Sequence, residues 1–102
     1  MFDYDDEWME MRAEAAAYAK ERKERVLKAW LTEINYKSDE PIGYDINPFM
    51  HETKIYSTRP GSLIGLRGIN VEKLKKILSD EYRSRKDWKI EFIEIRDGFF
   101  KL

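Results

Sequence analysis

Residues 59–68 read Arg59-Pro60-Gly61-Ser62-Leu63-Ile64-Gly65-Leu66-Arg67-Gly68, and a helical pattern begins directly after them. Gly65 and Gly68 are three positions apart, so the chain can turn there without a side chain in the way. The N–H groups in the first turn of a helix have no partner within the helix, and they attract anions. The stretch therefore predicts a loop that contacts phosphate through its backbone, and it favours binding over catalysis.

The sequence on both sides of this loop predicts an α+β fold. A helix is expected at residues 70–82, with Asn70 as its N-cap and an apolar stripe formed by Val71, Leu74, Ile77 and Leu78. The other expected elements are a short helical turn at residues 63–64 and strands at residues 42–46, 53–58 and 88–95. Together these elements predict a three-stranded sheet that is covered on one face by helices.

Residues 7–36 predict a long N-terminal helix, because they contain no Gly or Pro and are rich in Ala, Glu, Lys and Arg. Such a helix would be roughly 45 Å long, so it must either bend or project from a small domain. It has two apolar stripes, the first made of Trp8, Met11, Ala15 and Tyr18 and the second of Leu27, Trp30, Leu31 and Ile34. We expect the second stripe to pack on the domain, and the first either to fold back or to meet a second copy of the chain. The expected division is an acidic lead-in with a helical extension at residues 1–25 and a folded domain at residues 26–102.

The last expected strand places Trp88, Ile90 and Phe92 on one face and then changes to Ile93 and Ile95. This change indicates either a bulge or burial of both faces of the strand. Trp88 and Phe92 are of a type that stacks on nucleic-acid bases, but their inward spacing favours a place in the core.

The composition of the 102-residue chain excludes several classes of protein. It has no Cys and a single His, so a thiolate metal site, a disulfide framework and a cysteine nucleophile are excluded. No apolar run is long enough to span a membrane, and the acidic start does not resemble a secretory signal. Carboxylate pairs such as Asp39-Glu40 lie in polar loops without a nucleophile or metal partner, so we expect no enzyme. The expectation is a cytoplasmic, single-domain protein without a cofactor or a metal.

Charge is segregated along the chain. Residues 1–52 carry 7 Lys and Arg against 13 Asp and Glu, whereas residues 53–102 carry 12 against 7. This asymmetry indicates that the second half faces a polyanion, and the alternative is two ordinary solvated faces that differ in charge.

The glycine stretch resembles the type II KH domain, in particular the one in the small-subunit ribosomal protein called S-three. That family has an Arg-Pro-Gly-x-x-Ile-Gly-x-x-Gly run before a Glu-Lys-Leu helix, and here the run is followed by Glu72-Lys73-Leu74. Residues 90–96 are similar to the family's last strand, and the resemblance covers residues 26–96. It implies the type II KH fold and a loop that clamps about four nucleotides of single-stranded RNA, or of single-stranded DNA.

The resemblance also implies the residues of the site. Gly65 and Gly68 would allow close approach of the backbone, and Arg67 would contact a phosphate. Further charge would come from Arg59, Lys73 and Lys76, and Ile64 would lie either under a base or in the core. Leu66 departs from the family, which usually has a basic or small residue there. The alternative is a KH-fold module for protein interaction or oligomerisation, with weak or no RNA binding; it is favoured by Leu66, the acidic first half and the long helix.

Overall fold

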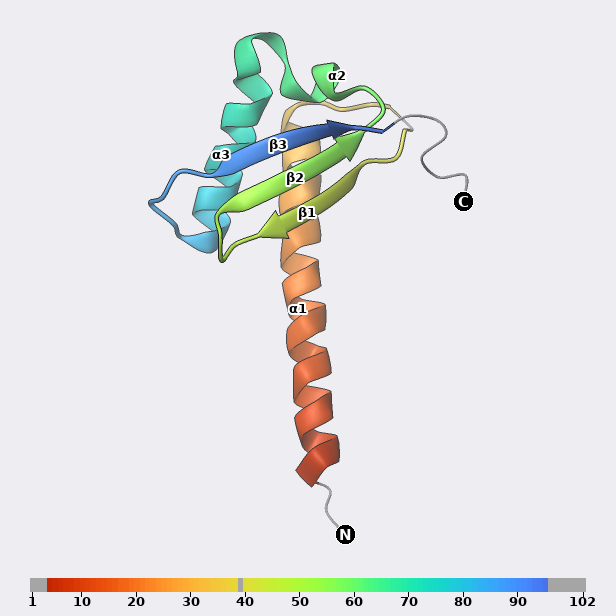
Figure 1. Cartoon of the computed structure of the whole chain (residues 1–102), viewed down its shortest axis with the longest axis vertical. Coiled ribbons are helices and arrows are strands. Elements are labelled where there is room, and N and C mark those ends of the chain that lie inside the picture. Colours follow the sequence, from red (N-terminus) through yellow and green to blue (C-terminus); the bar gives the residue numbers. More distant parts are fainter. Residues whose placement is uncertain (1–3, 39, 96–102) are drawn as a thin grey trace.

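The computed structural model describes residues 4–38 and 40–95, with side chains from Arg12 onward (Figure 1). The elements follow in the order α1 (Tyr4–Glu33), β1 (Gly43–Asn47), β2 (Glu52–Ser57), α2 (Pro60–Ile64), η1 (Leu66–Gly68), α3 (Ile69–Tyr82) and β3 (Lys89–Glu94). The predicted order of helices and strands is therefore confirmed. In the described residues, no helix combines the length and the apolar composition that crossing a membrane requires.

The sheet is three-stranded and mixed, in the order β1-β2-β3. β1 and β2 form an antiparallel hairpin in which Tyr44 lies opposite Ile55. β2 and β3 are parallel, with Ile55 opposite Phe92, and their register continues without a break to Ser57 and Glu94. The predicted change of face in the last strand therefore reflects burial of both faces of β3, and β3 contains no bulge.

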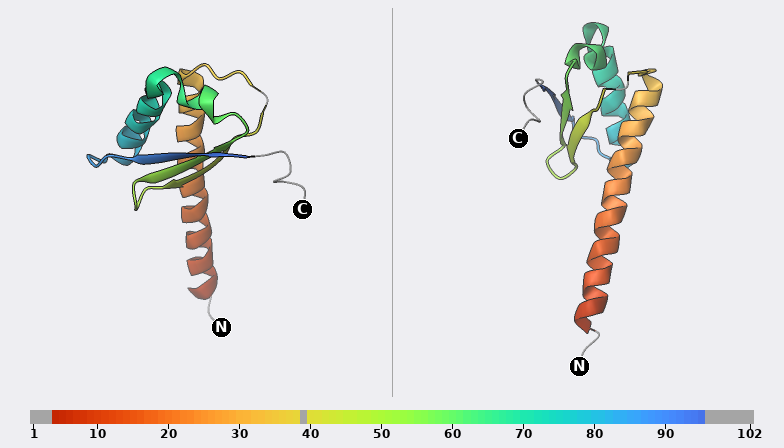
Figure 2. Two further views of the ribbon diagram at one scale, coloured as in Figure 1. Left: turned by 45° about the horizontal axis from the view of Figure 1, so that its top comes forward. Right: turned by 90° about the vertical axis from the view of Figure 1, so that its right-hand side faces the viewer.

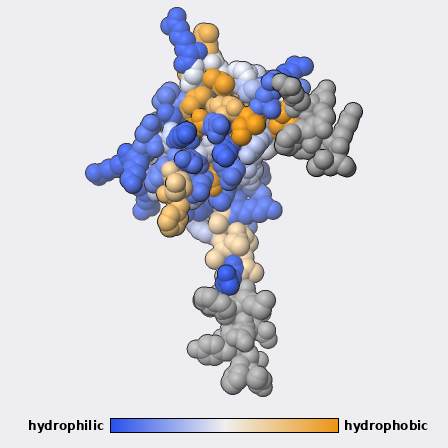
Figure 3. Space-filling view, viewed as in Figure 1, coloured by the Kyte–Doolittle hydropathy of each residue, from blue (hydrophilic) through white to orange (hydrophobic). Residues whose placement is uncertain are grey.

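The helices cover one face of this sheet, and the core lies between the two layers (Figure 2). The largest side chains of the core are Trp30 from α1 and Trp88, which directly precedes β3. Phe92 packs against the core, and its ring centroid lies 6.3 Å from that of Trp30. The predicted core positions of Trp88 and Phe92 are thus confirmed. On the opposite face of the sheet Ile93 is half-buried, and Figure 3 shows hydrophobic surface over these strands.

α1 continues through residues 25 and 26 without a break and projects from the domain (Figure 1). Every residue from Arg12 to Lys20 is exposed, including Ala15 and Tyr18 of the first apolar stripe, whereas Val26 is buried. The side chains of Trp8 and Met11 lie outside the described part of the chain. Of the two expectations for a helix of this length, projection is the one observed.

The ends of the helices differ from the prediction. α1 ends at Glu33, where Asn35 adopts a left-handed φ of 58°. The N–H of Tyr36 then donates to Leu31 O over 2.9 Å, as in a Schellman motif. The prediction that Asn70 is the N-cap of α3 is wrong, because Gly68 occupies that position and Asn70 lies inside the helix. Glycine takes the cap here because the chain enters α3 in the left-handed region, which Asn tolerates less well.

Candidate nucleic-acid interface

The loop between α2 and α3 is a tight turn at the end of the domain where α3 begins (Figure 1). Gly65 has φ 76° and ψ 172°, a region that is essentially restricted to glycine. Gly68 has φ 74° and ψ 19°, and Arg67 between them is also left-handed at φ 56°. The N–H of Gly65 donates to Gly61 O and the N–H of Gly68 donates to Gly65 O, each over 3.2 Å. The backbone therefore requires glycine at position 65, and it favours glycine at position 68.

The two glycines differ in their surroundings. A Cβ on Gly65 would lie 2.7 Å from Nδ2 and 2.8 Å from Cγ of Asn70, so the space beside it is already filled. No atom lies within 4 Å of the position that a Cβ on Gly68 would take. Gly65 thus permits close packing within the protein, whereas Gly68 leaves an open approach from solvent.

Asn70 connects the loop to the core. Its side chain lies against Gly65, and its carbonyl oxygen accepts a hydrogen bond of 2.8 Å from Nε1 of Trp30. Trp30 is fully buried, so α1 fixes the position of the first turn of α3. Asn70 therefore fixes the loop at its first residue, Gly65, and at the start of the helix that follows it.

The tip of the loop presents apolar and cationic side chains to solvent. Leu66 is 82% exposed, Ile69 is 54% exposed, and Arg67 is also exposed. A cation beside two exposed apolar side chains suits a ligand that has both an anionic backbone and flat apolar faces.

The start of α3 leaves part of its backbone N–H groups to an anion. The N–H of Ile69 already donates to Leu66 O, but Gly68 provides no side-chain cap, so no side chain occupies the N–H groups that follow in the first turn. Lys73 and Lys76 lie one and two turns into the helix, Lys73 half-buried and Lys76 exposed. Glu72 opposes them in the first turn, although Nζ of Lys75 lies 4.0 Å from its carboxylate. The positive character of this helix start therefore comes from its backbone together with Arg67 and two lysines.

The remaining two predicted residues lie apart from the tip. Arg59 precedes α2, and its Nε lies 3.5 Å from Oε1 of Glu40. Ile64, the last residue of α2, is half-buried, whereas its neighbour Leu63 is fully buried. Ile64 thus combines partial packing with partial access from the surface, and the charge of Arg59 is offset by a carboxylate.

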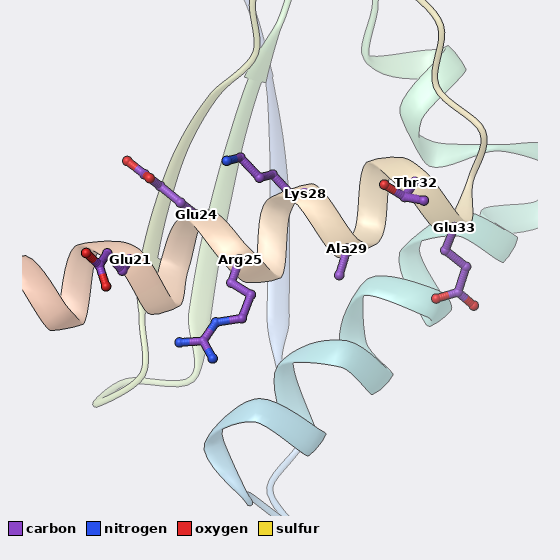
Figure 4. Close-up of a pocket in the computed structure, with 7 residues that line it drawn as sticks. All are labelled: Glu21, Glu24, Arg25, Lys28, Ala29, Thr32 and Glu33. Carbon is purple, nitrogen blue, oxygen red and sulfur yellow. The ribbon is translucent and has the colours of Figure 1, made fainter.

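A hollow of about 660 Å³ lies along α1, and its lining includes no residue of this loop (Figure 4). Its lining carries charges of both signs, and in Figure 4 Arg25 extends toward α3 while Glu24 and Lys28 extend to the other side of the helix. It contains no aromatic residue among those described, and no group of three or more His, Asp or Glu in the described chain is placed to hold a metal ion. We interpret this hollow as a solvated helix face.

Two residues of the loop region were missed by the sequence analysis. Ile69 directly follows the second glycine and lies outside the apolar stripe of α3, which is the signal that could have marked it as exposed. The contact of Asn70 with Gly65 had no such signal, because a suitable cap residue near a helix start is normally read as a cap.

Neither the known protein families nor the curated proteins contain a match to this sequence.

Proposed function

We propose that this chain has the type II KH fold and binds single-stranded RNA, or less favourably single-stranded DNA, through the loop Gly65–Gly68, without catalysis. The observation that carries the proposal is the open side of Gly68 at an uncapped helix start, next to exposed Arg67. The order helix, strand, strand, helix, helix, strand supports the fold that the resemblance implies. A cytoplasmic location remains a prediction.

Weak, salt-dependent binding is expected from this loop. Few cations surround it, and each phosphate contact adds to the slope of affinity against salt concentration. Leu66 stands where the family usually has a basic or small residue, so the loop lacks a second cation at its tip, which lowers the expected affinity further. A second point of contact with the strand, or a second copy of the chain, would raise the affinity by increasing the effective concentration.

The test replaces both Leu66 and Arg67 with Asp and measures the binding of fluorescein-labelled oligouridine by anisotropy at low salt. The matched control is Lys28→Asp with Ala29→Asp, which makes the same change in net charge at two exposed positions of α1. We expect the loop variant to lose binding and the control to keep it, with unchanged circular dichroism spectra for both. Equal binding by the two variants would show that the loop is not the site.

The second candidate function is self-association through the projecting part of α1. It is favoured by the exposure of every residue from Arg12 to Lys20, which leaves the apolar positions Ala15 and Tyr18 uncovered. Ala15→Glu would place a charge on this stripe. Ala13→Glu would place it about 200° around the helix and is the matched control. Sedimentation that shows a dimer in the wild type and in Ala13→Glu, but a monomer in Ala15→Glu, would support this function; a wild-type monomer at high concentration would exclude it.

A further inference from the structure

Two large apolar side chains project from the tip of the β1–β2 hairpin. Phe49 is 93% exposed and Met50 is 63% exposed. They are held there by Asn47, whose Oδ1 accepts hydrogen bonds from the N–H of Phe49 over 3.0 Å and of Met50 over 3.1 Å. The exposure is thus a property of a defined turn and not of a loose loop.

This turn is anchored to the start of β3 and to the buried Trp88 that precedes the strand. The N–H of Lys89 donates to His51 O over 2.9 Å, and the ring of His51 lies 5.0 Å from that of Trp88. The connection between α3 and β3 therefore lies beside the hairpin tip. Figure 1 and both views of Figure 2 place the two at the same end of the sheet. In Figure 3 this end is largely hydrophilic, with hydrophobic surface at the hairpin.

The connection is rich in cations. Arg83, Arg85, Lys86 and Lys89 are all exposed, and none of them forms an ion pair with a described residue. The one anion in this connection, Asp87, lies 3.5 Å from Nζ of Lys75, so its charge is already offset. Glu52, which is paired in register with Lys89, is the nearest carboxylate on β2. The positive charge of the connection therefore remains available to a ligand.

We infer that these residues form a second contact for single-stranded RNA, at the opposite end of α3 from the glycine loop. This hairpin-end patch consists of Phe49, Met50, Arg83, Arg85, Lys86 and Lys89. An exposed aromatic ring stacks on a base, and free cations beside it neutralise the flanking phosphates. A protein partner that bound through Phe49 and Met50 alone would have no use for the four cations, so the charge favours RNA.

The distance between the two contacts fits one continuous strand. The glycine loop precedes α3 and Arg83 directly follows it, and a helix of 14 residues is about 21 Å long. A stacked strand advances about 3.4 Å per nucleotide, so roughly six nucleotides span that distance. Added to the approximately four nucleotides that a Gly-x-x-Gly loop holds, the site would take about ten nucleotides, which a strand of twelve nucleotides covers.

This inference rests on the proposed function of the loop, and oligonucleotide length separates the two. Oligouridine of four nucleotides tests the loop alone, and oligouridine of twelve nucleotides tests both contacts. Titrations of the full chain are followed by NMR, which detects weak binding and locates it. The four-nucleotide strand should shift the amide signals of Gly65 and Gly68 only, whereas the longer strand should also shift those of Met50 and Arg85.

Variants of the hairpin-end patch sharpen the test. Phe49→Ser, and separately Arg85→Ser with Lys86→Ser, should each weaken binding of the longer strand about tenfold and leave that of the four-nucleotide strand unchanged. The matched controls are Tyr18→Ser, which removes an exposed aromatic elsewhere, and Lys28→Ser with Lys37→Ser, which removes two exposed cations elsewhere. Both should bind as the wild type does.

Two results would overturn the inference. If the patch variants bind both strands as tightly as the wild type while the loop signals still shift, the second contact is wrong and the proposed function stands; the hairpin would then be left to a protein partner. If neither strand shifts any signal, the proposed function fails and the second contact fails with it.

Discussion

The two halves of α1 are both built from strong helix formers, but they lie in different surroundings. From Arg12 to Lys20 every residue is exposed, and this half contains five of the alanines. From Val26 onward the helix carries bulky apolar residues, and Val26 and Trp30 are buried. Helix propensity thus accounts for the continuous helix, whereas burial begins only where large side chains begin. Residues 22–24, which are half-buried, mark the boundary.

The difference implies that the effect of a substitution in α1 on the free energy of unfolding depends on its position along the helix. In the second half, removing a side chain creates a cavity and breaks contacts with α3 and the sheet. In the first half the same change alters only local helix propensity. Four substitutions along α1 and at its contact with α3 test this, from the largest expected effect to the smallest.

Trp30→Ala should have the largest effect. It removes a fully buried indole and leaves Asn70 O without its hydrogen bond, so we expect the free energy of unfolding to fall by about 3–5 kcal/mol in urea denaturation. Trp30→Phe keeps most of the packing and loses only the hydrogen bond, so its loss should be clearly smaller. A small effect of Trp30→Ala would contradict the view that α1 is joined to the domain through this residue.

The contrast between Trp30 and Asn70 also shows how far the sequence predicts this molecule. Spacing alone placed Trp30 in the apolar stripe of a helix, and the positive φ that Gly65 and Gly68 adopt is the use for which glycine is expected. The link from Trp30 to Asn70 joins residues forty positions apart, so no local pattern contains it. The exposure of Phe49 was not predicted either. Asn47 shapes this turn through local hydrogen bonds, but whether an apolar side chain in a turn is covered depends on tertiary contacts that no local pattern contains.

Arg22→Ala should have an intermediate effect, because Arg22 lies at the boundary between the two halves. Its Nε is 3.2 Å from Oε1 of Glu81, another of its nitrogens donates to Glu81 O over 2.6 Å, and its guanidinium lies 4.5 Å from the ring centroid of Tyr82. The side chain is 30% exposed, so we expect a loss of about 1 kcal/mol in the free energy of unfolding. Lys20→Ala in the projecting half, where the side chain is exposed, is the comparison. Equal effects from the two variants would place the boundary elsewhere.

Tyr82→Phe should stabilise the contact between α1 and α3 slightly. The hydroxyl of Tyr82 is buried without a hydrogen-bond partner in the described structure, so its removal should raise the free energy of unfolding by up to about 1 kcal/mol. Burial raises the pKa of Tyr82, opposed by the nearby Arg22 and reinforced by Glu81. The folded state therefore favours the neutral phenol, and the stability that this provides is present below about pH 10 and is lost as the pH rises further.

Comparing Tyr82→Phe with the wild type at pH 8 and pH 11 isolates this contribution from the lysines, which titrate in both proteins. The advantage of the variant should grow at the higher pH. An advantage that is the same at both values would mean that the phenol titrates alike in the folded and unfolded states.

Tyr18→Ala should have the smallest effect on the domain. Tyr18 is 59% exposed, and alanine is a better helix former, so the free energy of unfolding should change by less than about 0.5 kcal/mol. The measurement is made by urea denaturation at low micromolar protein concentration and again at a hundredfold higher protein concentration.

If the projecting half is only a solvated extension, the wild type and the variant have the same free energy of unfolding, within about 0.5 kcal/mol, at both concentrations. If it pairs with a second copy, the wild type alone gains stability with concentration, because association favours the folded state by mass action. A loss near that of Trp30→Ala at low concentration would instead mean that the two halves of α1 do not differ, and the comparison would fail.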